Sequence, residues 1–185
     1  MKKLFVVAFA LVAIAFAPQA FAQKMSNPMV GGAEMYPTKD IVDNAVNSKD
    51  HTTLVAAVKA AGLVETLKSA GPFTVFAPTN AAFDKLPAGT VATLVKPENK
   101  ATLTKILTYH VLAGKFSAKS IVAAIKKGKG KATFTTVQGD KLYASLVGKK
   151  VKLTDAKGGS SYVTIADVNQ KNGVIHVIDT VLMPK

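Results

Sequence analysis

The chain contains no cysteine and no arginine, and each absence excludes a class of function. Without cysteine there can be no disulfide framework, no thiolate nucleophile and no thiolate-bound metal. Without arginine the chain lacks the side chain that most often grips phosphate and guanine edges through two parallel hydrogen bonds. All 24 basic residues are therefore lysines, and with 11 acidic residues they give a formal net charge of +13. We expect no specific recognition of nucleic acid.

The first 22 residues have the three parts of a secretory signal peptide. Lys2 and Lys3 form a basic start, residues 4–16 form an apolar run, and Ala20-Phe21-Ala22 resembles a small-x-small cleavage site. The run is shorter than the ~20 apolar residues that a membrane-spanning helix needs. We therefore predict a signal peptide over residues 1–22, a secreted or periplasmic product, and no transmembrane segment after cleavage.

The rest of the chain fits one α+β domain over residues 39–185, preceded by an exposed leader over residues 23–38 that is rich in Pro and Gly breakers. Apolar spacing predicts helices over 39–46, 52–61, 63–67, 97–110 and 117–127, the second capped by Thr52 or Thr53 and the last by Ser117. Thr79 can cap a further helix that contains Phe83. Alternation predicts strands over 73–77, 131–137, 141–146, 149–154, 161–168 and 174–182. Helices followed by mostly antiparallel strands are typical of the α+β class.

Two strand regions carry distinctive patterns. The strand over residues 174–182 is apolar on both faces, which predicts a central strand covered on both sides. The segment before it, residues 167–173, resembles a calcium loop, but Lys171 and Ile178 occupy positions where oxygen ligands are needed. We predict a β-turn there instead.

Three histidines are the remaining candidates for chemistry, and their spacing supports none. We expect His51 to be exposed beside a helix start and His110 to be buried on the apolar face of a helix, whereas His176 lies in mid-strand. No pair has a local zinc spacing, and Asp179 would lie on the opposite strand face from His176. We predict no catalytic residue, no metal and no cofactor, although a constellation built from distant segments stays open.

Three motifs together resemble the fasciclin domain family. They are GPFTVFAPTNAAF at residues 71–83, followed by Leu86-Pro87, LTYHVL at residues 107–112, and NGVIHVID at residues 172–179. The resemblance covers about residues 40–184 and is strongest to the bacterial single-domain members. It implies a strand-rich wedge or sandwich of mostly antiparallel strands packed with several helices, and a role in binding or adhesion. It also implies candidate partner-binding residues, Tyr109 and His110 and more weakly Asp40 and Ile41, since such pairs are linked to integrin binding in animal members.

Two functions from different classes fit these observations. The first is an exported, non-enzymatic adhesion-type domain, expected to be a monomer, that binds a protein or a cell-surface or matrix partner. The alternative is charge-driven binding of anionic polysaccharide or membrane surfaces. That alternative depends on nine lysines in two clusters: Lys115, Lys119, Lys126, Lys127, Lys129, Lys131, Lys149, Lys150 and Lys152. An enzyme or small-ligand carrier is least favoured, because no local constellation supports it.

Overall fold

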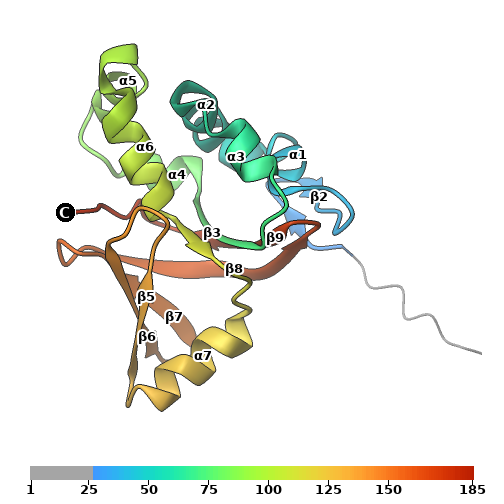
Figure 1. Cartoon of the computed structure of the whole chain (residues 1–185), viewed down its shortest axis with the longest axis vertical. Helices are drawn as coiled ribbons and strands as arrows, with labels where there is room; N and C mark the ends of the chain where they lie inside the picture. The colour runs from blue at the N-terminus through green and yellow to red at the C-terminus, as the bar shows by residue number, and fades with distance from the viewer. Residues whose placement is uncertain (1–26) are drawn as a thin grey trace, which may run out of the picture.

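The structure is a computed structural model that describes residues 27–185, so the predicted signal peptide and residues 23–26 lie outside the described part. Within it, a seven-stranded sheet crosses the middle and lower part of the molecule, with α1 to α6 above it and α7 below (Figure 1). The sheet contains β3 (Phe73–Pro78), β4 (Val111–Ala113), β5 (Lys131–Thr135), β6 (Lys141–Val147), β7 (Lys150–Thr154), β8 (Ser160–Gln170) and β9 (Gly173–Ile178). This arrangement confirms the predicted α+β class.

The helices follow the predicted order. They are α1 (Ile41–Ala45), α2 (Thr52–Ala61), α3 (Val64–Lys68), α4 (Asn80–Asp84), α5 (Thr90–Leu94), α6 (Lys100–Tyr109) and α7 (Ala118–Lys127), with 3-10 turns η1 (Lys49–His51) and η2 (Pro97–Asn99). The helix α5 was not predicted, because its five residues leave none of their side chains buried and so show little apolar periodicity.

The strand order is β4-β3-β9-β8-β7-β6-β5, and β3 and β9 at its heart are parallel while the other neighbouring pairs are antiparallel. The parallel pair runs in register from Phe73 opposite Gly173 to Pro78 opposite Ile178. Gly173 is required there, because a Cβ atom would lie 2.1 Å from the carbonyl oxygen of Phe73. The two strands come from the first and third family motifs, which are about a hundred residues apart in sequence.

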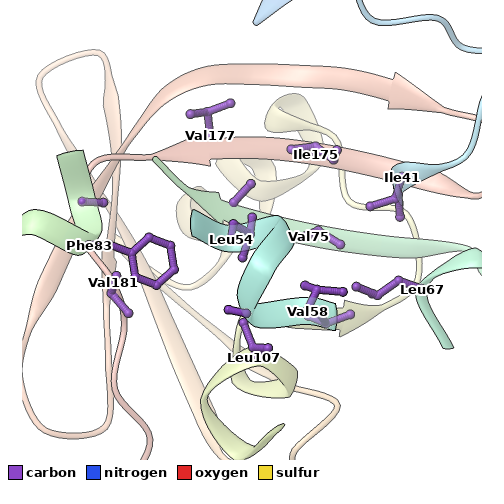
Figure 2. Close-up of a cluster of buried hydrophobic side chains, with 14 of the residues drawn as sticks. Ile41, Leu54, Val58, Leu67, Val75, Phe83, Leu107, Ile175, Val177 and Val181 are labelled. Atoms are coloured by element: carbon purple, nitrogen blue, oxygen red, sulfur yellow. The ribbon is translucent and has the colours of Figure 1, made fainter. Parts of the chain in front are cut away.

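Side chains of this parallel pair alternate between two hydrophobic cores. Those facing the helices are Val75, Ala77, Ile175 and Val177, which pack with Leu54, Val58 and Leu107 from α2 and α6 (Figure 2). Those facing the other way, Phe76 and Ile178, join the core between α7 and strands β5 to β7. Both strands are thus covered on both faces, as the sequence predicted for the strand over residues 174–182.

Some helices are capped by a residue next to them in sequence, and one is capped by a residue from another helix. Thr79 caps α4 by accepting from the amide of Ala82 at 3.2 Å, and Ser117 caps α7 in the same way, as their sequence positions indicated. The predicted cap of α2 was wrong. The amide of Thr53 instead donates to Oδ1 of Asn80, 3.0 Å away in α4. A side chain from another helix has replaced the local cap.

The segment expected to be an exposed leader is partly folded within the described residues. It forms a small hairpin of β1 (Met29–Val30) and β2 (Ala33–Glu34). Val30 and Met35 are buried in the helix-side core, although Met29 between the breakers is exposed. Two apolar side chains therefore anchor a stretch whose Pro and Gly content suggested solvent exposure.

Replacing Phe76 should test how much the motif at residues 71–83 stabilises the domain. The ring is completely buried and stacks on His176, with ring centroids 5.7 Å apart. Phe76→Ala should lower the free energy of unfolding by roughly 3–5 kcal/mol, because it leaves a cavity in a packed core. Urea denaturation followed by circular dichroism would measure it, with Val147→Ala on the exposed surface as the control. A loss below about 1 kcal/mol would show that the ring does not support the fold.

Candidate functional site

His110, from the LTYHVL motif at residues 107–112, is buried and has both ring nitrogens hydrogen-bonded to the backbone. His110 is 3% exposed, its Nδ1 donates to the carbonyl of Ile106 at 2.8 Å, and its Nε2 accepts from the amide of Leu182 at 3.0 Å. One ring nitrogen therefore carries the proton and the other is engaged by a backbone donor, so neither is free for a metal or a substrate. Burial lowers the pKa of His110 to about 4, against the smaller raising effects of the Ile106 carbonyl and Asp155.

The other two histidines are buried as well. His176 accepts from the amide of Asp167 at 3.2 Å and donates to the carbonyl of Phe116 at 2.8 Å, and burial lowers its pKa. The expectation that His51 is exposed was wrong, since it is 3% exposed with Nδ1 2.8 Å from the hydroxyl of Ser48. Its Nε2 has no hydrogen-bond partner among the described residues. Burial lowers the pKa of His51, against smaller raising effects of the Ala77 backbone and of Asp50.

Tyr109 is equally enclosed. Its hydroxyl donates to the carbonyl of Lys141 at 2.8 Å and accepts from the amide of Ala156 at 3.0 Å. Burial raises the pKa of Tyr109 to about 12, with smaller contributions from nearby groups. A partner could reach Tyr109 or His110 only if the domain opened, so in the folded chain both residues hold α6 to the strands.

Asp40 and Ile41 form the start of α1. Asp40 is half-buried, accepts from the amide of Asp43 at 2.8 Å as the helix cap, and pairs with Lys68 at 3.0 Å. Ile41 is buried in the helix-side core, and its amide donates to Oδ1 of Asn172 at 3.1 Å. Only Asp40 of this pair offers a charged group near the surface, and that group is already engaged.

One hollow lies inside the helix-side core, with a volume of about 80 Å³. Its wall is almost wholly apolar and includes Leu54, Val58, Val75, Leu107 and Ile175. A site for turnover needs several polar groups that converge on a substrate. The wall contains no carboxylate and a single lysine, Lys59, so charged groups do not converge in it as such a site requires. Within residues 27–185, moreover, no three acidic or histidine side chains gather as a metal site would demand.

Six of the nine candidate lysines lie on α7, β5 and β7, on two opposite sides of the sheet. The helix α7 packs its buried Ile121 and Ile125 against the inner face of β5 and β6, and carries Lys119, Lys126 and Lys127 outward on that side. Lys131, Lys150 and Lys152 alternate with buried residues on β5 and β7 and therefore project from the opposite, outer face. The remaining three lie in connecting segments: Lys115 before α7, Lys129 after it, and Lys149 in the turn between β6 and β7.

The outer face of β5 to β8 forms a regular grid that no helix of the described chain covers. One cross-strand row reads Lys131, Ser145, Lys152 and Tyr162, and the next reads Thr133, Tyr143, Thr154 and Ser160. Lys150 lies opposite Val147 and Lys141 opposite Thr135. We call this surface the lysine–tyrosine face and define it by Lys131, Lys141, Tyr143, Lys150, Lys152 and Tyr162. Its tyrosines and Lys141 were missed from the sequence, although strand alternation combined with hairpin register would have placed them there.

Charge on this part of the chain is not compensated. Residues 115–154 contain ten lysines and a single acidic residue, Asp140. The ion pairs found between described residues both involve Lys68, far from this surface in the sequence. Lys131 instead lies over the ring of Tyr143, with Nζ 4.0 Å from its centroid. The lysine–tyrosine face therefore carries four lysines, Lys131, Lys141, Lys150 and Lys152, that form no ion pair with a described carboxylate.

The buried histidines predict a pH-dependent loss of stability. In the unfolded chain His110 takes up a proton near pH 6.5, but in the folded chain only near pH 4. The free energy of unfolding should fall as pH drops from about 6.5 to about 4, by on the order of 3 kcal/mol from His110 alone. Denaturant titrations at several pH values across this range would measure the free energy of unfolding. That free energy should depend less steeply on pH in His110→Gln than in the wild type. Parallel slopes would contradict the prediction.

Comparisons with known proteins agree with this architecture. The protein sll1483 of Synechocystis sp. is 50% identical over 144 residues, covering 78% of this chain and 73% of that protein. The cell surface glycolipoprotein MPB83 of Mycobacterium bovis is 35% identical over 167 residues, covering 90% of this chain and 65% of that protein.

Among solved structures, the FAS1 domain pair of the insect cell adhesion molecule Fasciclin I superposes with a TM-score of 0.69 at 18% identity. The superposition covers 78% of this chain and 51% of that one, which shows a shared fold. No helix in residues 27–185 is long and apolar enough to cross a membrane. The family model described as the fasciclin domain matches residues 49–184, and the chain therefore belongs to the fasciclin domain family.

Proposed function

We propose that this chain is an exported adhesion-type binding domain that engages a protein, cell-surface or matrix partner without catalysing a reaction. The observation that carries the proposal is the use of the family motifs for packing. His110, His176 and Tyr109 have their polar atoms paired inside the domain. Function must therefore act through the exposed surface, and a cell-surface relative and an adhesion molecule of the same fold support that direction.

Direct attachment of the protein to cells tests the adhesion proposal. Beads coated with the mature chain should bind the cells that export it more strongly than beads coated with an unrelated lysine-rich protein of equal net charge. Crosslinking in living cells followed by mass spectrometry would then identify the captured partner. Attachment no greater than that of the charge-matched control would overturn the proposal.

Export makes a separate prediction about the N-terminus. If residues 1–22 are removed as a signal peptide, the protein recovered from the periplasm or medium should begin at Gln23. Intact-mass spectrometry distinguishes this product from the full chain by the mass of 22 residues. Recovery of a chain that still begins at Met1, in the membrane fraction, would instead indicate a retained anchor.

Charge-driven binding of anionic polymers is the second candidate. It is favoured by the ten lysines and one acidic residue of residues 115–154. Such binding should weaken steeply with salt, because screening shortens the reach of exposed charges. The two candidates are compatible if the cell-surface partner is itself a polyanion.

A further inference from the structure

We propose that the lysine–tyrosine face is a binding site for an extended anionic polysaccharide, and that the lysines of α7 are not part of it. This inference rests on the proposed role as a surface-binding domain and assigns that role a surface and a ligand class. It divides six of the nine candidate lysines: Lys131, Lys150 and Lys152 lie on the outer face of the sheet, and Lys119, Lys126 and Lys127 lie on α7 on the opposite side.

The spacing of the charges is the first argument. Neighbouring strands lie about 4.8 Å apart, so Lys131 on β5 and Lys152 on β7, separated by Ser145 on β6, have backbones roughly 10 Å apart. Lys150 and Lys152 stand about 7 Å apart along β7. The sheet fixes these intervals. A linear polymer with repeated anionic groups can therefore contact several lysines at once, and the protein backbone loses little conformational entropy on binding.

The groups between the lysines are the second argument. Tyr143 and Tyr162 are half-buried in the same grid, and Thr133, Ser145, Thr154 and Ser160 add hydroxyl groups beside them. Tyrosine combines an apolar ring with a polar tip, which suits the apolar face and hydroxyl rim of a sugar. Hydroxyl side chains both donate and accept hydrogen bonds. Lysines for the anionic groups and tyrosines with hydroxyls for the sugar rings thus occur on one surface.

Other classes of partner fit this face less well. A protein partner binds through anchors that fill well-packed pockets, but the two tyrosines of this face are half-buried among lysines and hydroxyl groups, and its exposed large apolar side chain is Val147 at the end of the grid. A membrane-binding surface normally inserts apolar side chains below the headgroups, and the face offers no row of them. The absence of arginine disfavours nucleic acid, whose guanine edges are most often read by bidentate arginine.

The helix α7 provides a matched control. Lys119, Lys126 and Lys127 are as exposed as Lys131 and Lys150, but their neighbours on the helix are mostly Ala, Ser and Val, with no tyrosine. Replacing three lysines by glutamine on either side removes the same net charge. Any difference in polymer affinity between the two triple variants therefore depends on where the lysines lie and not on the net charge of the protein.

The test measures binding of the mature protein to heparin as a sulfated probe and to polygalacturonate as a carboxylate probe, with neutral dextran as a blank. The triple variant Lys131→Gln, Lys150→Gln, Lys152→Gln should bind at least one anionic probe about tenfold more weakly near 0.15 M salt, because multivalent contact is lost. The triple variant Lys119→Gln, Lys126→Gln, Lys127→Gln should stay within about threefold of the wild type. Melting temperatures would confirm that both variants remain folded.

A change at Tyr143 separates ring recognition from charge. Tyr143→Phe should retain most of the affinity, whereas Tyr143→Leu should weaken it severalfold without altering its salt dependence, because the aromatic face is lost and the charges stay. Equal affinities of Tyr143→Leu and Tyr143→Phe for the polymer would show that the ring of Tyr143 does not contribute to binding.

Several outcomes would overturn the inference. Equal weakening by the two lysine triples would mean that scattered charge drives binding. Tighter binding to vesicles containing anionic phospholipid than to either polymer would assign the face to a membrane surface. If the wild type binds neither polymer but its coated beads still attach to cells, this inference fails and the adhesion proposal stands. If the beads also fail to attach, both fail.

Discussion

The parallel pairing of β3 with β9 is the constraint on which the rest of this domain depends. The pair joins segments about a hundred residues apart, and all of β9 and most of β3 are buried. Alternate side chains of each strand enter different cores, so one pairing sets the position of the helices on one side and of α7 with β5 to β7 on the other. A slip of one residue would exchange the two sets of side chains and disrupt both cores.

Buried polar side chains fix the segments around this pair. Asn172 accepts from the amide of Ile41 and donates to the carbonyls of Leu67 and Ser69, so that one amide ties α1 and the end of α3 to the turn before β9. Asp179 accepts from the amide of Tyr162 at 2.8 Å and thereby links the end of β9 to β8. Satisfied polar groups of this kind specify one arrangement, because any other leaves them buried without partners. This explains why the family motifs hold the scaffold and the distinctive chemistry of the surface lies outside them.

The surface follows a different rule from the core. Strand alternation in β5 to β7 sends Phe134, Leu142 and Leu153 inward and lysine, threonine and tyrosine outward. Because α7 covers the inner side alone, the outer side stays open to solvent and its charge is available to a partner. The fold thus divides one basic stretch of sequence into two surfaces with different neighbours.

The sequence by itself determined the α+β class, most helices and strands, the caps at Thr79 and Ser117, the buried state of His110 and the family, because these depend on local periodicity and on motifs. Tertiary structure alone decided the rest. Parallel pairing of β3 with β9 and capping of α2 by Asn80 join residues that no local pattern connects. The burial of His51 likewise depends on what packs over it, and the separation of Lys131 and Lys152 from the lysines of α7 depends on which face the helix covers. Local patterns fix which way a side chain points along its own element, but only packing between elements decides what it meets there.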